Sequence, residues 1–106
     1  MIKVSVMYPY REGARFDHAY YREQHMPMVQ QKLGQACRYY TIDRGLAGGA
    51  PGAAPAYEAM SHLFCDSIET FQAAMAPHAG QIMADVPNYT DLQPLIQVSE
   101  VVVERS

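Results

Sequence analysis

The sequence lacks the features that mark nucleic-acid-binding, secreted and membrane-spanning proteins. Among its 106 residues, lysine occurs only as Lys3 and Lys32, no run of basic residues exists, and the net charge is -3. Nucleic-acid binding needs a basic footprint, which is missing here. No apolar run approaches the roughly 18 residues that span a bilayer, and residues 1–6 alternate like a strand instead of forming a signal peptide's apolar core. We therefore expect a cytoplasmic protein with no nucleic-acid and no membrane partner.

Cysteine is also scarce, and so are the motifs of metal and nucleophile chemistry. Cys37 and Cys65 are the only cysteines, too few for a disulfide framework or a zinc site. No two histidines have the i, i+4 spacing that, with a nearby acid, marks a metal-binding helix. The motif G-x-S-x-G, the motif C-x-x-C and the glycine-rich phosphate loop are absent. We expect two buried free thiols in a reducing compartment and no metal site.

Charged residues are few for so small a protein. They make up 18% of the chain, against 49% hydrophobic residues, although much of the surface of a small domain should be wet. A chain of this length is expected to form a single domain over residues 1–106, burying roughly two-thirds of its unfolded surface. The low charge suggests that a partner covers part of that surface.

Hydrophobic periodicity predicts six elements in the order strand, helix, strand, strand, helix, strand. The strands are expected over residues 2–9, 36–46, 56–65 and 93–104. This order is typical of an α+β ferredoxin-like fold, with the helices on one face of an antiparallel sheet. A right-handed crossover places the third strand between the first two. The small-residue segment 45–55 is either a flexible hairpin connection or a lid, and a turn near its centre would place Cys37 and Cys65 opposite each other.

Both helical segments carry start signals and an internal proline. Asp17 is the expected N-cap of the first helix, and Pro27 predicts a kink near its middle because proline removes an N–H and crowds the preceding turn. Asp66 precedes Glu69 by three residues, the spacing of a capping box at the start of the second helix. Pro77 predicts that the second helix is broken into two short ones.

The two faces of the predicted sheet indicate a homodimer. In the last strand, Leu95 and Val103 fall on one face, while Ile96 and Val98 fall on the other. Helices on one side of the sheet cannot cover both apolar faces. A second copy of the chain, in a self-complementary two-fold contact, is the simplest cover. A monomer mass in solution at micromolar concentration would refute this prediction.

His25 is the strongest candidate for chemistry. It shares the apolar stripe of the first helix with Tyr21 and Val29, just before Pro27, so its ring should face the sheet. An imidazole there could exchange protons near neutral pH. The alternative is a structural histidine that is hydrogen-bonded to backbone groups freed by the kink.

His62 and three tyrosines are candidates for a ligand pocket. His62 lies in the middle of the third strand, where it would line a pocket at the sheet or rim the dimer contact. Tyr8, Tyr21 and Tyr40 combine an apolar body with a polar tip, which suits a pocket for a moderately polar organic molecule. The alternative for the tyrosines is ordinary strand composition.

Several stretches of the chain resemble the signature of the EthD family. They are residues 16–21 (FDHAYY) with residues 24–29 (QHMPMV), residues 83–91 (MADVPNYTD), and the first strand with Tyr8-Pro9 and Glu12-Gly13. The resemblance covers nearly the whole chain, with its segments in the right order. It implies a dimeric α+β barrel, in which two ferredoxin-like subunits join their sheets. This agrees with the argument from the two apolar faces.

The resemblance also implies a functional setting. EthD-type proteins are associated with the breakdown of ethyl tert-butyl ether beside a cytochrome oxygenase system, and they are often labelled oxidoreductase-like. The wider group includes monooxygenases of polyketide tailoring and isomerases of muconolactone type, in which a helix histidine before a proline borders the pocket. His25 matches that position. Haem-degrading relatives use a pocket tryptophan, which this chain lacks, so haem is not expected.

Two functional hypotheses follow. The first is a small dimeric enzyme that acts on a hydrophobic oxygenated metabolite without a bound cofactor, with His25 as acid or base and Tyr8, Tyr21 and Tyr40 shaping the cavity. The second is a non-catalytic accessory or carrier protein that serves a partner oxygenase. A ligand pocket without turnover would favour the second hypothesis.

Overall fold

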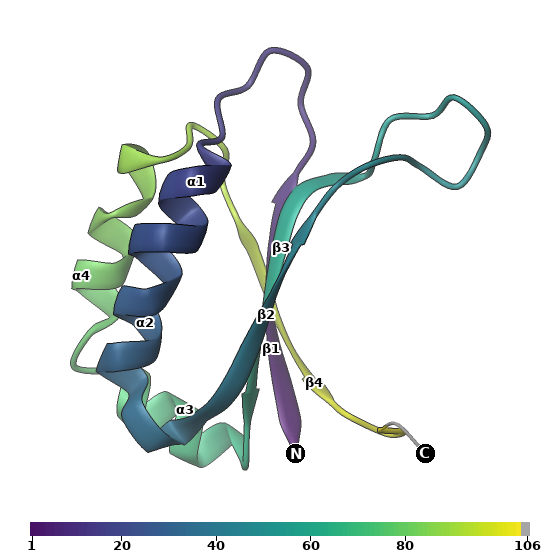
Figure 1. The fold of residues 1–106 in the computed structure, drawn as a ribbon. Coiled ribbons are helices and arrows are strands. Elements are labelled where there is room, and N and C mark those ends of the chain that lie inside the picture. The colour runs from purple at the N-terminus through teal and green to yellow at the C-terminus, as the bar shows by residue number, and fades with distance from the viewer. Residues whose placement is uncertain (105–106) are drawn as a thin grey trace.

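The computed structural model describes residues 1–104 and has the expected α+β ferredoxin-like fold (Figure 1). The strands are β1 (Ile2–Pro9), β2 (Cys37–Arg44), β3 (Tyr57–Cys65) and β4 (Leu95–Glu100). They form one antiparallel sheet in the order β2-β3-β1-β4. This order confirms the prediction that the third strand lies between the first two.

The helical segments lie together on one side of the sheet (Figure 1). Between β1 and β2 the chain forms α1 (His18–Tyr20), the π-helical turn η1 (Tyr21–His25), α2 (Met26–Leu33) and the 3-10 turn η2 (Gly34–Ala36). Between β3 and β4 it forms α3 (Ile68–Met75), α4 (Ala79–Ala84) and the 3-10 turn η3 (Val86–Asn88). In the described range, no helix has the length and apolar character needed to cross a membrane.

The first helix contains the predicted irregularity in the form of a π turn. Asp17 is its N-cap, as predicted, and accepts a hydrogen bond from the backbone N–H of Tyr20 at 3.0 Å. The Met26 N–H then bonds to the carbonyl of Tyr21, five residues back, and Pro27 lies in the first turn of α2. Proline has no N–H for a regular helical bond and its ring crowds the preceding turn, which favours the wider geometry here.

The second helix begins one residue later than predicted. Its N-cap is Ser67, whose Oγ accepts from the backbone N–H of Thr70 at 3.0 Å. The expectation that Asp66 caps this helix is therefore wrong, because Asp66 instead binds Arg38 at 2.7 Å. Ser67 has the extended backbone that an N-cap requires. The break predicted at Pro77 is confirmed, since it lies between α3 and α4.

Strand β4 is shorter than the predicted 93–104. It ends at Glu100, which pairs with Ile2, the first residue of β1. Beyond that point β1 offers no further residues to pair with, so residues 101–103 lie outside the strand and Val102 and Val103 are 82% exposed. β-branched residues favour a strand only where a neighbour completes it.

The face of the sheet away from the helices is more polar than predicted. Ser5, Thr41, His62 and Gln97 share this face. The same face also carries apolar side chains, which we call the open-face patch. Met7, Met60 and Leu95 lie on one side of this polar row, and Tyr39 and Phe64 lie on the other. The prediction of two fully apolar faces therefore holds only for part of this one.

The core lies between the sheet and the helices. Val4, Tyr8 and Leu63 from the sheet are buried against Tyr21 and Val29 of the first helix. At the edge of this core Cys37 of β2 lies opposite Cys65 of β3 in the strand register, as the predicted hairpin requires. Both thiols are buried and free, and burial raises the pKa of Cys65 to about 11.

The segment between β2 and β3 projects away from the helices (Figure 1). Its backbone closes on itself, with the Gly48 N–H bonding the carbonyl of Ala53 at 2.8 Å. At Gly45 a Cβ would collide with the carbonyl of Tyr57, so the chain can leave β2 this way only with glycine. None of its residues lines the cavity described below.

Candidate small-molecule site

A cavity of about 260 Å³ lies between the sheet and the helices. Its polar lining residues are Tyr8, Tyr21, His25 and Ser61, and the other thirteen are apolar. No Lys, Arg, Asp or Glu of the described residues lines it. The most exposed lining residues are Ile96 at 58% and Met83 at 49%, so the cavity opens between β4 and α4.

Two structural periodicities bring the polar lining residues together. On β1 and β3, alternation turns Tyr8 and Ser61 toward the helices. In the first helix, the π turn carries Tyr21 and His25, and both are buried against the sheet. The prediction that His25 faces the sheet is confirmed.

The hydroxyl groups at the cavity wall are already paired within the protein. The hydroxyls of Tyr8 and Tyr89 hydrogen-bond to each other at 2.5 Å. The Tyr21 hydroxyl donates to the Oγ of Ser61 at 2.7 Å. Burial raises the pKa of Tyr8, Tyr21 and Tyr89, so all three phenols stay neutral.

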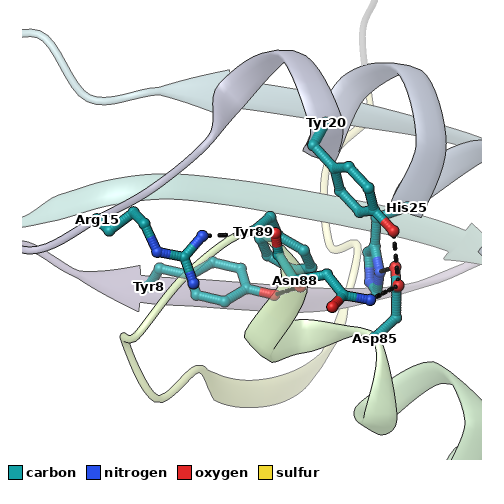
Figure 2. A network of polar contacts seen from close by, with 7 residues as sticks. All are labelled: Tyr8, Arg15, Tyr20, His25, Asp85, Asn88 and Tyr89. Atoms are coloured by element: carbon teal, nitrogen blue, oxygen red, sulfur yellow. Dashed lines mark hydrogen bonds and ion pairs between the residues drawn. The ribbon is translucent and has the colours of Figure 1, made fainter.

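His25 is held by a carboxylate (Figure 2). Its Nδ1 lies 2.8 Å from Oδ2 of Asp85. The other oxygen of Asp85 accepts from the Tyr20 hydroxyl and from the side-chain amide of Asn88, each at 2.8 Å. The His25 ring lies nearly parallel to that of Tyr21, with the ring centres 5.5 Å apart. His25 is therefore not the backbone-bonded structural histidine of the alternative reading.

The environment pushes the His25 imidazole toward its neutral form. Burial lowers the pKa of His25 below its ordinary value of 6.5, and the hydrogen bond to Asp85 only partly opposes this. Burial alone would raise the pKa of Asp85, but the hydrogen bonds from His25, Asn88 and Tyr20 outweigh it and lower that pKa. At neutral pH the pair is therefore a neutral imidazole beside a carboxylate.

The structure separates Tyr40 and His62 from the cavity. Tyr40 is half-buried against the core near the β2 edge and does not line the cavity. His62 lies on the opposite face of the sheet, because it alternates with the inward-facing Ser61 and Leu63. There its ring bonds Ser5 at 2.7 Å and Asp43 at 3.1 Å.

The described residues contain no cluster of three or more His, Cys, Asp and Glu side chains suited to a metal ion. The contact between His18 and Glu58, at 2.7 Å, lies outside the cavity lining. Of the described residues that line the cavity, His25 is the only one with an imidazole, and Asp85 is its hydrogen-bond partner.

Comparison with known proteins decides the family. Residues 13–93 match the family model of the EthD domain. The chain belongs to the EthD family. Its EthD fold is closely similar to the crystal structure of an EthD-like protein from Ralstonia eutropha, with 63% identity, a TM-score of 0.96, and coverage of 99% of this chain and 95% of that one.

More distant structures share the EthD fold alone. An ethyl tert-butyl ether d (EthD) family protein from Bacillus halodurans is 20% identical with a TM-score of 0.69, and the match covers 94% of this chain and 97% of that one. A dimeric ferredoxin-like protein of unknown function from Thermobifida fusca is 14% identical with a TM-score of 0.56, over 94% and 90% of the two chains. No curated protein matches this chain.

Sequence reasoning missed the second half of the candidate site. Asp85, Asn88 and Tyr89 all come from residues 83–91, which were noted in the sequence only as part of the family resemblance. The presence of this run in the family signature was a signal that its polar residues do more than turn the chain. Asp85 binds His25 across 60 positions and Tyr89 binds Tyr8 across 81 positions, and contacts between residues so far apart leave no local pattern.

Proposed function

We propose that this EthD family protein binds a small, mostly apolar, oxygenated metabolite in the cavity and transforms it by proton transfer at His25. The observation that carries this proposal is the His25 imidazole, neutral and held 2.8 Å from Asp85, at the wall of a cavity that is lined mostly by apolar residues. A few polar groups in an apolar pocket are typical of ligand sites, and a titratable residue with a shifted pKa is typical of catalytic ones. The similarity to the Bacillus halodurans protein, an ethyl tert-butyl ether d (EthD) family member, supports a setting in ether degradation.

The proposed chemistry uses His25 as a base and then as an acid. Its imidazole takes a proton from an O–H or an acidified C–H of the substrate, and the resulting imidazolium is stabilised by the Asp85 carboxylate 2.8 Å away. The same proton is returned to another atom of the substrate, which gives an isomer. Tyr8 and Tyr21 would hold the substrate by shape.

Proton exchange tests this role without knowledge of the natural substrate. We expect the wild-type protein to accelerate exchange of the α-hydrogens of cyclohexanone in heavy water, followed by proton NMR. His25→Ala should fall to the buffer rate, because the base is removed. His78→Ala, which changes a histidine outside the cavity lining, is the matched control and should keep the wild-type rate. Equal exchange by wild type and His25→Ala would refute the catalytic role.

We propose that the protein acts as a homodimer through the open-face patch. Tyr39 is 50% exposed and stacks on Phe64 with ring centres 4.4 Å apart, and the Thermobifida fusca neighbour is described as dimeric. Sedimentation should give a dimer for the wild type and a monomer for Tyr39→Arg, which would bury a charge in the contact. Tyr10→Arg, at a tyrosine that is 40% exposed outside the patch, should remain dimeric.

The second candidate is an accessory protein that carries an intermediate for a partner oxygenase. It is favoured by the pairing of the Tyr8, Tyr21 and Ser61 hydroxyls inside the protein, which leaves few polar groups to act on a ligand. This function predicts that cyclohexanone binds without exchange of its α-hydrogens. It also predicts that deletion lowers pathway flux while the purified protein turns nothing over.

A further inference from the structure

We infer that the cavity takes a neutral, one-ring-sized molecule that donates a hydrogen bond, because Asp85 keeps the His25 proton on Nδ1 and so leaves Nε2 as a hydrogen-bond acceptor. Phenols, enols and alcohols belong to this class and should bind more tightly than ethers and ketones of the same size, whereas carboxylates are excluded. The inference rests on the proposed binding function and names its ligand class. It also makes Asp85 a positioning residue.

The hydrogen bonds around Asp85 determine where the His25 proton lies. An ionised carboxylate only accepts hydrogen bonds. Its Oδ1 accepts from Tyr20 and Asn88, so the atom that faces its Oδ2, Nδ1 of His25, must be a donor as well. A neutral imidazole carries one proton, and here that proton is on Nδ1. Nε2 then holds a lone pair.

Nε2 faces space that a ligand can occupy. It forms no hydrogen bond to any described residue, although His25 is only 4% exposed. Among the described residues, no side-chain nitrogen or oxygen is sealed in the interior without a partner. Nε2 must therefore border an open space, and the cavity that His25 lines is that space.

The rest of the lining narrows the ligand class. The hydroxyls of Tyr8, Tyr21 and Ser61 are occupied by partners inside the protein, and no basic residue among the described ones lines the cavity. A carboxylate or phosphate would be an unpaired charge in an apolar space, which is strongly unfavourable. A ligand that only accepts hydrogen bonds would leave Nε2 without a donor.

The cavity volume limits the ligand's size. A cavity of roughly 150 Å³ is enough for benzene, so about 260 Å³ accommodates one ring with a short substituent. It is slightly smaller than the roughly 300–1,000 Å³ of pockets for drug-sized ligands. Val4, Leu63 and Met75, which line the cavity, offer only apolar contact to the rest of the molecule.

Asp85→Asn should reverse the preference of the cavity. Its Oδ1 must remain an oxygen, because Tyr20 and Asn88 both donate to it. The amide NH₂ of the new side chain then faces His25 and donates to Nδ1. The imidazole proton moves to Nε2, and the cavity presents a donor in place of an acceptor.

Three test ligands of matched size read out this change. Phenol is a strong hydrogen-bond donor, cyclohexanone only accepts, and toluene does neither. Their affinities would be measured by NMR titration of the full-length wild type, Asp85→Asn and His25→Phe. Nitrogen NMR of isotope-labelled histidine would report in parallel which ring nitrogen carries the proton.

For the wild type we expect the proton on Nδ1 and roughly three- to tenfold tighter binding of phenol than of cyclohexanone, the value of one hydrogen bond. Asp85→Asn should move the proton to Nε2 and reverse this order. His25→Phe, which keeps an aromatic ring but no nitrogen, should remove the phenol preference over toluene.

The outcomes separate this inference from the proposed function. Phenol preference that persists in Asp85→Asn, or a wild-type proton on Nε2, would overturn the inference and leave the cavity a binding site. Failure of all three ligands to bind the wild type would overturn both. If Asp85→Asn does not fold, the wild-type nitrogen spectrum and the wild-type and His25→Phe affinities decide the matter.

Discussion

Ala79→Leu should make the protein more stable and stop it from binding ligands. Ala79 is the small apolar residue of α4 that lines the cavity. Leucine adds three carbon atoms to that space, worth about 2.4 kcal/mol at roughly 0.8 kcal/mol per buried methylene. Ordering the leucine side chain costs about 0.5–1 kcal/mol. The net gain in the free energy of unfolding is about 1.5–2 kcal/mol, or about 6–16 °C in Tm for a chain of this size.

Urea and thermal unfolding would measure the stability change, and NMR titration with phenol would measure binding. Ala73→Leu, on the exposed side of α3, is the matched control and should change stability by no more than about 0.5 kcal/mol. Loss of stability in Ala79→Leu would show that the cavity has no space to fill. Unchanged phenol affinity in a stabilised variant would show that ligands bind elsewhere.

Three further predictions follow from the described contacts. Ser67→Ala should lower the free energy of unfolding by about 1 kcal/mol in urea titrations because it removes the N-cap, and an equal or larger loss in Asp66→Ala would contradict the capping assignment. Because burial holds the pKa of His25 below 6.5, the unfolded chain binds that proton more readily, so stability should fall as pH drops below about 6.5. This loss of stability should be smaller in His25→Phe than in the wild type when both proteins are unfolded at pH values between about 7.5 and 5.5. Parallel curves of stability against pH would refute the contribution of His25. Tyr8→Phe and Tyr89→Phe should each cost about 1–3 kcal/mol because each leaves the other buried hydroxyl unpaired. The double variant should cost less than their sum in a thermal double-mutant cycle, and strict additivity would argue against the shared hydrogen bond.

Much of the fold could be predicted because its signals are local. Alternation located the strands, Pro77 located the break between α3 and α4, and the handedness of crossovers gave the strand order. The end of β4 could not be predicted in this way. Residues 101–103 favour a strand by composition, but the strand stops where β1 runs out at Ile2.

The site was predictable only in its first half. His25 and Tyr21 lie on a helical stripe next to a proline, and both were found from that pattern.

The N-cap of α3 shows a limit of sequence patterns. Asp66 and Ser67 are both good N-cap residues, and only the backbone conformation of Ser67 decides between them. Asp85 carries no periodic signal at all, because its role depends on a contact made 60 residues away in the sequence.

The π turn has a consequence for how such a site could arise and be altered. A π turn is a helical turn with one additional residue, and its wider geometry takes up the roughly 100° by which that residue would otherwise rotate one side of the helix relative to the other. Tyr21 and His25 lie at its two ends and both reach the cavity. Deleting one residue from 22–24 would restore a regular helix, in which these two side chains are three residues apart and still share a face. The helix can therefore gain or lose one residue at this point without removing either ring from the cavity wall.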